Sequence, residues 1–522
     1  MDHTPLAPRR RWAATAALCL GLFLLGLDLT VLNVAVPGLQ ADLDASMGET
    51  QWVVDAYALV LGGLVLTVGA LTDRLGRRRA FVCGVYVCAL ASVCGAVAAD
   101  PAQVIAARAG MGAGAALLMP ATLSIVSALF PDPAERARAI ALWTAVGGLG
   151  GGCGPVIGGW LVDQFSWRAA FWINLPFALA IVALTLWLVP AFRPVRGTRA
   201  DPPGAVLSAA GLLALVWSII ESPGRGWTSP EVLAGYAGAG LLLVLFVLWE
   251  RRTPHPMLPP ALLGQRRISL SAGALAMMSF ALYGSLFVAT LYLQGVLDYS
   301  PWRAGLCTLP LPGGLIVGAA LSVRLGARCG QRATLLLGLA VVAGGFAVLA
   351  GIGPDSGYPP LAAFQIIAGT GAGLIATAAT ASVMDAVPEG QAGLGSAVND
   401  ATRQVGVALG VAVQGSVLAA GYGDRMSRDL AAAHAPAALD PATDNILAAR
   451  ALSDHVPAGS RERLLDSASE AFTWGMTHAA LVAGAVVTLT GLAVWRCLPG
   501  RRRAAPRPEP ATESTPVTHL TA

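Results

Sequence analysis

The chain has 522 residues, of which 55% are hydrophobic and only 12% are charged. Soluble globular proteins carry about 25% charged residues, so this composition excludes an ordinary soluble enzyme and indicates a membrane protein with many spans. All 34 basic residues are arginine and the formal net charge is +4. The placement of these charges is more informative than their sum.

Long apolar segments recur along the whole chain, and each can cross the hydrocarbon core of a bilayer. Such segments must be helical, because the bilayer offers their backbone no hydrogen-bonding partners. The first segment follows Arg9, Arg10 and Arg11 and is too long for the core of a signal peptide, so we predict an uncleaved span. The fourteen predicted spans are 13–37, 51–71, 80–98, 101–129, 139–162, 169–190, 204–220, 233–248, 268–293, 304–323, 333–352, 360–387, 394–421 and 472–495.

The arginines determine the predicted orientation. With the N-terminus inside, most of the 34 arginines fall in cytoplasmic segments, as the positive-inside rule requires. Removing one span from the count would reverse the later loops and break this pattern. We therefore predict a plasma-membrane protein with both termini in the cytoplasm.

Two pairs of similar segments indicate an internal repeat. Ala109–Gly114 resembles Ala368–Gly373 at an offset of 259 residues, and Leu71–Arg78 resembles Leu325–Arg332, more weakly, at an offset of 254. We predict an all-α polytopic membrane protein with two parallel six-helix halves and two inserted helices. The predicted division is a cytoplasmic N-terminus 1–12, a first half 13–190, inserted helices 204–248, a second half 268–495 and a disordered cytoplasmic tail 496–522.

Ionisable residues inside spans are costly and are therefore functional candidates. Asp28 lies in the outer half of the first span, and Arg108 lies in the fourth span near the outer side. A buried guanidinium needs carboxylates or carbonyls, and Asp28 and Asp55 are its expected partners. Such a pair can hold an acid that exchanges a proton during transport. The alternative is a static ion pair that keeps the helices in register.

Segment thirteen carries a second polar group, with Asn399, Asp400 and Arg403. Asp400 and Arg403 are three residues apart and are neighbours on a helix, so a self-satisfied local pair is one interpretation. Asp400 is otherwise the best acid in the second half for binding a proton or a cation. The sequence contains no Walker loop, nucleophile elbow or metal-spaced His/Cys set. We expect no metal and no cofactor, with transport driven by a proton or substrate gradient.

The cytoplasmic loop around residues 69–79 combines glycines with charges: Gly69, Asp73, Arg74, Gly76 and Arg78. Glycine permits a tight turn, and the carboxylate can accept hydrogen bonds from arginine or from a helix N-terminus. We predict that this loop latches two helix ends in one conformation. The alternative is a plain positive-inside loop.

Segment five contains small residues at intervals of four, namely Gly150, Gly154 and Gly158, with Pro155 and Gly159 beside them. This spacing lets two helices approach closely, and proline bends a helix. The pattern predicts close packing, and it suits a helix that must slide or rock.

Taken together and in this order, the motifs resemble those of the fourteen-span drug:proton antiporters of the major facilitator superfamily. The segments that carry the resemblance are Leu27–Pro37, Gly69–Arg79, Arg108–Ala116, Gly150–Gly159, Trp167–Pro176 and Gly393–Gly406. The resemblance implies that Asp28, Asp55 and Asp400 handle protons or cations and that Arg108 takes part in coupling. It also implies that Asp73 and Arg74 belong to a gating loop.

The chain departs from the family pattern at two positions. Met111 stands where the helix-four motif usually has glutamine, and Ala327 stands where the second-half loop often has an acid. The first departure changes the neighbourhood of Arg108. The second predicts an asymmetric cytoplasmic latch.

Our functional hypothesis is proton-coupled efflux of antibiotics or other hydrophobic or amphipathic compounds by alternating access. The candidates for lining the substrate cavity are Asn33, Met111, Asn399 and Arg403. The expected partners are the small-molecule substrate, protons and the lipid bilayer, with no nucleic acid, and by analogy the protein acts as a monomer. The alternatives are a uniporter or importer of a small metabolite, and a receptor or scaffold without transport.

Overall fold

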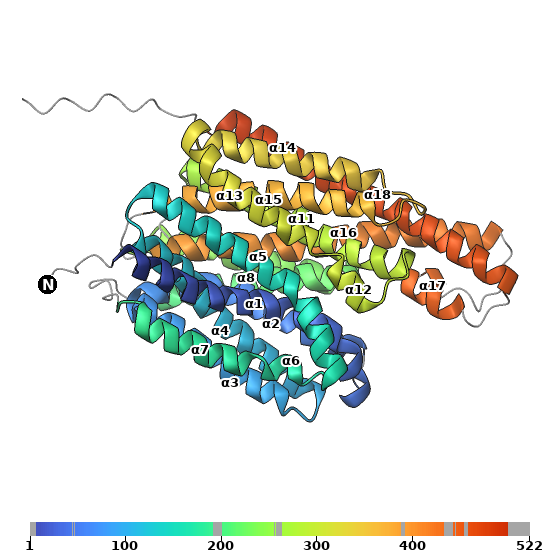
Figure 1. The fold of residues 1–522 in the computed structure, drawn as a ribbon, viewed down its shortest axis with the longest axis horizontal. Helices are drawn as coiled ribbons and strands as arrows, with labels where there is room; N and C mark the ends of the chain where they lie inside the picture. Colours follow the sequence, from blue (N-terminus) through green and yellow to red (C-terminus); the bar gives the residue numbers. More distant parts are fainter. Residues whose placement is uncertain are drawn as a thin grey trace, which may run out of the picture.

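The computed structural model describes residues 7–43, 45, 47–191, 201–254, 256, 264–387, 392–432, 442–443, 445–453 and 458–498. Within these ranges the chain is helical throughout its ordered elements and contains no β-strand (Figure 1). Fourteen of the helical segments are long and apolar enough to cross a membrane. The predicted all-α, fourteen-span fold is confirmed. The predicted tail after residue 498 lies outside the described residues.

The first half packs around one hydrophobic core. In it α1 packs along α5, and both α2 and α3 pack along α4. The short helix α6 and the longer α7 together form the sixth span. The helices are α1 (Pro8–Leu43), α2 (Met47–Leu75), α3 (Arg77–Ala96), α4 (Pro101–Leu129), α5 (Pro133–Gln164), α6 (Ala169–Trp172) and α7 (Asn174–Leu188).

The second half repeats this arrangement around its own core. Here α11 packs along α16, and α13 and α14 pack along α15. The two halves meet where α2 packs on α16 and where α5 packs on α13. The elements are α11 (Arg266–Leu291), the π-helix η1 (Tyr292–Val296), α12 (Pro301–Leu306), α13 (Pro310–Cys329), α14 (Gln331–Ala350), α15 (Pro359–Ala386), α16 (Ala392–Ala432), α17 (Ile446–Ser453) and α18 (Ala458–Cys497).

The inserted hairpin consists of α8 (Pro202–Arg225) and α9 (Pro230–Glu250), which pack on each other. Helix α8 also packs on α2 of the first half and on α16 of the second half. The hydroxyls of Thr67 and Ser208 lie 3.0 Å apart, and the Trp227 indole donates to Ser416 Oγ at 3.0 Å. The hairpin therefore lies along the α2/α16 contact between the halves and is bonded to both.

The outer segment between the last two predicted spans is more helical than a loop. Helix α16 continues to Ala432 and α18 begins at Ala458, so both helices project beyond the other spans together with α17 (Figure 1). This segment is rich in alanine, the strongest helix former. Its charges pair with each other, as Arg425 Nη2 does with Glu470 Oε2 at 3.6 Å.

The loop between α2 and α3 recurs in the second half with the same geometry. Gly76 has a φ of 86° and Gly330 has a φ of 85°, a region that favours glycine. Arg78 donates to the carbonyl oxygens of Leu186 and Val189 at the end of α7, and Arg332 donates to a carbonyl at the end of α18. The repeat at an offset of 254 residues is therefore a repeat of structure, and its arginine holds the end of the half's last helix.

The glycine-rich repeat in α4 and α15 is real, but the predicted offset of 259 residues is wrong by two. Glycines of α4 and of α15 touch equivalent carbonyl oxygens in the two halves. The matching contacts are Gly112 with Tyr57, Gly369 with Leu311, Gly114 with Gly84, and Gly371 with Gly338. The offset in this helix is therefore 257 residues. A glycine at every second position permits this error, because a shift by two still superposes glycines.

The predicted close approach of segment five is confirmed, and its partner is α1. A Cβ at Gly150 would lie 2.3 Å from the Phe23 carbonyl oxygen, and one at Gly158 would lie 2.8 Å from that of Val31. Gly154 faces Thr30 of the same helix. Pro155 and Gly159 lie inside α5, and Pro155 approaches α12 of the second half.

A second glycine face of α5 serves the contact between the halves. A Cβ at Gly148 would lie 3.0 Å from the Leu315 side chain, and one at Gly152 would lie 2.6 Å from the Pro312 ring, both in α13. This face was not singled out from the sequence. Helix α5 is thus smooth on the side that packs within its half and on the side that meets the other half.

Gly150→Ala tests the α1/α5 contact. We expect it to lower the free energy of unfolding by about 1–3 kcal/mol, as overpacking does, since the added methyl group would meet backbone. The matched control is Gly238→Ala in α9, where a Cβ would have nothing within 4 Å, with an expected change within about 0.5 kcal/mol. Thermal unfolding in detergent measures both. Equal melting temperatures would contradict the close contact.

Candidate functional site

The first candidate group is a buried ion pair inside the first half. Arg108 Nη1 of α4 donates to Asp28 Oδ2 of α1 at 2.7 Å. Arg108 is 1% exposed and Asp28 is 5% exposed. The sequence predicted Asp28 and Asp55 as partners of Arg108, and the structure confirms Asp28. The side chain of Asp55 lies outside the described residues.

Other helices of the first half complete the surroundings of this pair. Arg108 Nε donates to the Val53 carbonyl at 3.1 Å, and its guanidinium lies over the Tyr57 ring, 4.5 Å from the centroid. Asn174 Nδ2 of α7 donates to Asp28 Oδ1 at 3.2 Å. Five spans therefore contribute to, or border, one buried charge pair. Removing either charge would leave the other uncompensated in a low-dielectric interior.

A small cavity adjoins the pair. Its volume is about 10 Å³, and its lining includes Asp28, Tyr57, Met111 and Asn174. This is the size of about one water molecule. The Tyr57 hydroxyl and Asn174 Oδ1 have no hydrogen-bond partner among the described residues. The site can therefore accommodate a water next to the carboxylate, which is the minimum that proton exchange requires.

Met111, a predicted substrate-cavity residue, lies elsewhere than expected. It is 2% exposed, lines the small cavity beside Asp28, and its carbonyl accepts from the Cys88 thiol at 3.3 Å. It is thus an interior residue of the first half and does not face the second half. The side chain of Asn33, another predicted cavity residue, lies outside the described residues.

The second candidate group lies on α16, where the second half meets the first. Asp400 is completely buried, and its Oδ1 accepts from Arg403 Nη2 at 3.2 Å. Its Oδ2 has no partner among the described residues. The local pair predicted from the spacing is therefore present, but it satisfies only one carboxylate oxygen. Asn399 Oδ1, one residue away, accepts from Thr380 of α15 at 3.1 Å.

Arg403 extends from this group onto the first half. Its guanidinium lies 5.4 Å from the ring centroid of Trp143 in α5, and Nη2 lies 3.8 Å from the Met119 sulfur in α4. Trp143 is itself 1% exposed and donates to Thr122 Oγ1 at 3.1 Å. Sequence reasoning missed Trp143, although a single tryptophan inside a glycine-rich span is an unusual choice. Asp400 and Arg403 thus sit at the interface of the halves, where Asp28 and Arg108 do not.

The repeat shows that these charges break the symmetry of the two halves. Phe23 meets Gly150 as Phe280 meets Gly410, so α1 and α11 correspond at an offset of 257 residues and α5 and α16 at 260. The positions equivalent to Asp28, Arg108, Asp400 and Arg403 are then Ser285, Gln365, Ile140 and Trp143. Each buried charge therefore corresponds to a neutral side chain in the other half.

The cytoplasmic ends of the halves are joined by an ion pair. Arg136 Nη1 of α5 lies 3.3 Å from Asp385 Oδ1 of α15, and Gln331 donates to Asp385 Oδ2 at 3.3 Å. The sequence places Arg136 among the cytoplasmic charges and Asp385 at a span end that a solvated side chain would explain. The structure instead pairs them across the halves. Nothing in the local sequence reveals a contact between residues 249 positions apart.

The predicted gating loop is partly described. Gly69 lies in α2, Gly76 forms the turn, and Arg78 holds the end of α7. The predicted latch between helix ends is present through Arg78. The side chains of Asp73 and Arg74 lie outside the described residues.

The outer end of α1 is fixed by the motif at residues 167–176. The Trp167 indole donates to Asp42 Oδ2 at 3.0 Å, and Arg168 pairs with the same oxygen. These two contacts, the indole hydrogen bond first, hold the pKa of Asp42 below its ordinary value. Arg168 also donates to the Ala98 carbonyl at 3.2 Å, so the motif joins the outer ends of α1 and α3.

No group of three or more His, Cys, Asp or Glu side chains in the described part of the chain is placed to hold a metal ion. The chemistry available at the two groups is therefore that of carboxylates, guanidinium groups and amides. These groups can bind and release protons or bind a cation.

Known proteins share this sequence along most of its length. The chain is 34% identical to the multidrug resistance protein Stp of Mycobacterium tuberculosis, over 92% of this chain and 90% of that protein. It is 38% identical to the puromycin resistance protein of Streptomyces alboniger, over 78% and 82% of the two chains. It is 32% identical to the tetracenomycin C resistance and export protein of Streptomyces glaucescens, over 93% and 91%.

Solved structures share the fold. The human organic anion transporter MFSD10 aligns with a TM-score of 0.58 at 16% identity, over 92% of this chain and all of that chain. A bacterial homologue of the lysosomal transporter Spinster aligns with a TM-score of 0.57 at 18% identity, over 95% of this chain. The sequence profile of the Major Facilitator Superfamily matches residues 18–411. By this match and by its relatives, the chain belongs to the Major Facilitator Superfamily of membrane transporters.

Proposed function

We propose that this protein exports antibiotics or other hydrophobic or amphipathic compounds across the plasma membrane in exchange for protons. Relatives named for drug resistance and export along nearly the whole chain support the direction and the substrate class. The observation that carries the proton coupling is Asp400. This acid is completely buried at the interface of the halves, with one carboxylate oxygen unpartnered among the described residues.

In the proposed cycle, Asp400 carries the proton and Arg403 holds the carboxylate once the proton has left. An incoming substrate, particularly a cation, competes with Arg403 for the same carboxylate, so substrate and proton exclude each other. Asn399 and Arg403 would line the substrate cavity with Asn33, and Asp55 would collect protons at the outer mouth. Both termini would be cytoplasmic, as the arginine distribution supports.

Asp28 and Arg108 would transmit this exchange within the first half. Protonation of Asp28 removes the counter-charge of a guanidinium that is 1% exposed. A buried cation without a partner is strongly unfavourable, so Arg108 would move toward other acceptors such as the Val53 carbonyl. Because this pair connects α1 with α4, its rearrangement would change how these helices pack.

Substrate-triggered proton movement tests the proposal. Wild type, Asp28→Asn and Asp400→Asn would be reconstituted in liposomes holding a pH-sensitive dye, with a panel of lipophilic cations and antibiotics added. We expect movement in wild type, its loss in Asp400→Asn and a strong reduction in Asp28→Asn. The control is Asp429→Asn, in the part of α16 beyond the predicted span. Substrate flux in wild type that ignores the pH gradient would favour a uniporter.

A double-mutant cycle separates coupling from a static role for the buried pair. Arg108→Gln should cost about 3–5 kcal/mol of stability, because it leaves a buried charge unpaired. The double variant Asp28→Asn/Arg108→Gln removes both charges and should recover most of that stability in thermal unfolding. We expect it to remain uncoupled in the liposome assay. Recovery of both stability and proton coupling would show that the pair only holds the helices together.

The cytoplasmic contact between Arg136 and Asp385 should bias the protein toward the state closed to the cytoplasm. These side chains are 20% and 27% exposed, so the pair contributes at most about 1 kcal/mol. Asp385→Asn should therefore raise the cytoplasm-open population by up to about fivefold, and the exchange Arg136→Asp/Asp385→Arg should restore it. Spin labels at Arg138 and Arg324 in a cysteine-free background report the opening. An unchanged distance distribution in Asp385→Asn would rule out this role.

A further inference from the structure

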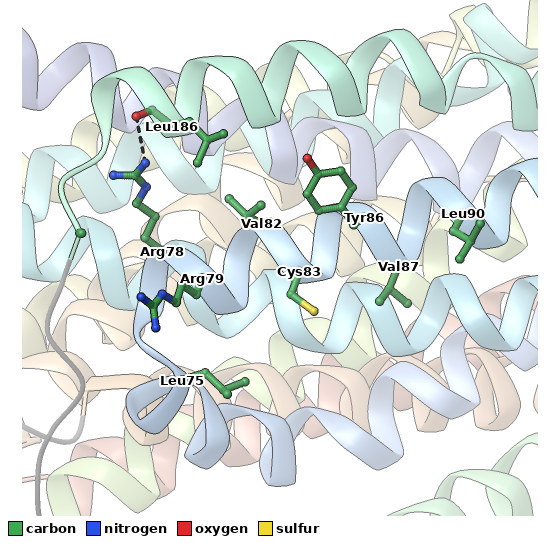
Figure 2. Close-up of a pocket in the computed structure, with 10 residues that line it drawn as sticks. Leu75, Arg78, Arg79, Val82, Cys83, Tyr86, Val87, Leu90 and Leu186 are labelled. Carbon is green, nitrogen blue, oxygen red and sulfur yellow. Dashed lines mark hydrogen bonds between the residues drawn. The ribbon is translucent and has the colours of Figure 1, made fainter.

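The first half carries a groove that the transport proposal does not use. It lies between α3, the end of α2 and the end of α7, and has a volume of about 750 Å³ (Figure 2). Helix α3 packs on α4, α7 and α6 within its own half, so this side of it faces away from the second half. Tyr86 and Leu90, which line the groove, are 57% and 69% exposed. A groove in this position faces lipid.

The two ends of the groove differ in chemistry. Arg78 and Arg79 lie at the cytoplasmic end, whereas Val82, Tyr86 and Leu90 follow along α3 (Figure 2). From Arg79 to Leu90 the helix rises about 16 Å at about 1.5 Å per residue. This equals roughly half of the ~30 Å hydrocarbon core of a bilayer. The groove therefore has the length and polarity of one lipid molecule in the cytoplasmic leaflet.

The two arginines have different duties. Arg78 donates to the carbonyl oxygens of Leu186 and Val189 and is needed to hold the end of α7. Arg79 is exposed and makes no hydrogen bond or ion pair with any residue that the structure describes. The groove therefore contains one guanidinium that is occupied in part and one whose charge no described side chain balances.

The repeat shows that the fold does not need a charge at position 79. At the offset of 254 residues, Gly76 corresponds to Gly330 and Arg78 to Arg332, which also holds the end of the last helix of its half. The residue equivalent to Arg79 is Ala333, exposed like Arg79. The same helix start thus forms with alanine, so the charge of Arg79 serves something other than the turn.

We propose that this groove binds an anionic glycerophospholipid of the cytoplasmic leaflet. The phosphate would lie against Arg79 and the free donors of Arg78, and an acyl chain would lie along α3 as far as Leu90. Basic pockets on the cytoplasmic side of membrane helices bind anionic headgroups in this manner. A lipid seated here touches Leu75 of α2 and Leu186 of α7, and so ties together three helix ends around the α2–α3 turn.

Retention of lipid tests this proposal independently of transport. The purified protein would be exchanged into mixed micelles with equal amounts of phosphatidylglycerol and phosphatidylcholine, and the retained lipid measured by native mass spectrometry. We expect wild type to prefer phosphatidylglycerol. Arg79→Gln should bind it about fivefold more weakly, which corresponds to the ~1 kcal/mol that a juxtamembrane arginine contributes. Arg79→Lys keeps the charge and should retain the preference.

Two further variants define the site. Arg324→Gln removes an exposed arginine of α13 in the second half and should leave retention unchanged. Cys83→Trp fills the groove without changing its charge and should lower retention as Arg79→Gln does. Melting temperatures confirm that each variant is folded.

Three results would overturn the proposal. The first is equal retention of phosphatidylglycerol by wild type and Arg79→Gln, and the second is equal retention of both lipids by wild type. The third is slower transport of an anionic compound by Arg79→Gln in vesicles of phosphatidylcholine alone. That last result would assign the groove to a transported compound instead of a lipid.

Discussion

The hydrocarbon interior of the bilayer supplies no hydrogen-bonding partner, and most of this structure follows from that constraint. Every span must be helical, and every polar side chain inside a span must find its partner within the protein. Arg108 does so through a carboxylate, a backbone carbonyl and an aromatic ring contributed by two other helices. The glycine faces of α5 follow from the same constraint, because helices in lipid gain association energy mainly from close packing.

The two halves show how one scaffold supports different chemistry. Both have the same helix contacts, the same positive-φ glycine at one turn and the same arginine holding the last helix. Their buried charges differ, since Asp28 and Arg108 correspond to Ser285 and Gln365. The first half therefore keeps a charge pair in its own core, while the second half presents Asp400 and Arg403 to the interface. Duplication provided the frame, and substitution at a few buried positions made it asymmetric.

The features that could be predicted from the sequence are those with a local physical signal. Span length, arginine placement and glycine spacing predict the fourteen helices and the smooth face of α5. The pairing of Asp400 with Arg403 follows from helical spacing alone. The pairing of Arg108 with Asp28 follows from depth in the membrane together with the cost of an unpaired charge.

The features that escaped prediction depend on how distant segments meet. The contact between Arg136 and Asp385 exists only because two helix ends from different halves converge. The interior position of Met111 depends on which side of α4 faces α3, and α4 is apolar on every side, so periodicity does not reveal it. The register of the α4/α15 repeat required the carbonyl contacts of Gly112 and Gly369.

The inserted hairpin makes the two contacts between the halves unequal in stiffness. On one side, α8 and the α8–α9 turn are hydrogen-bonded to Thr67 of α2 and Ser416 of α16, one residue from each half. On the other side, α5 meets α13 through Gly148 and Gly152 against apolar side chains, a contact that can slide without breaking a hydrogen bond. Movement between the halves is therefore a rotation about an axis near the hairpin. The wider displacement falls on the α5/α13 side, and a twelve-helix relative without the hairpin would not share this bias.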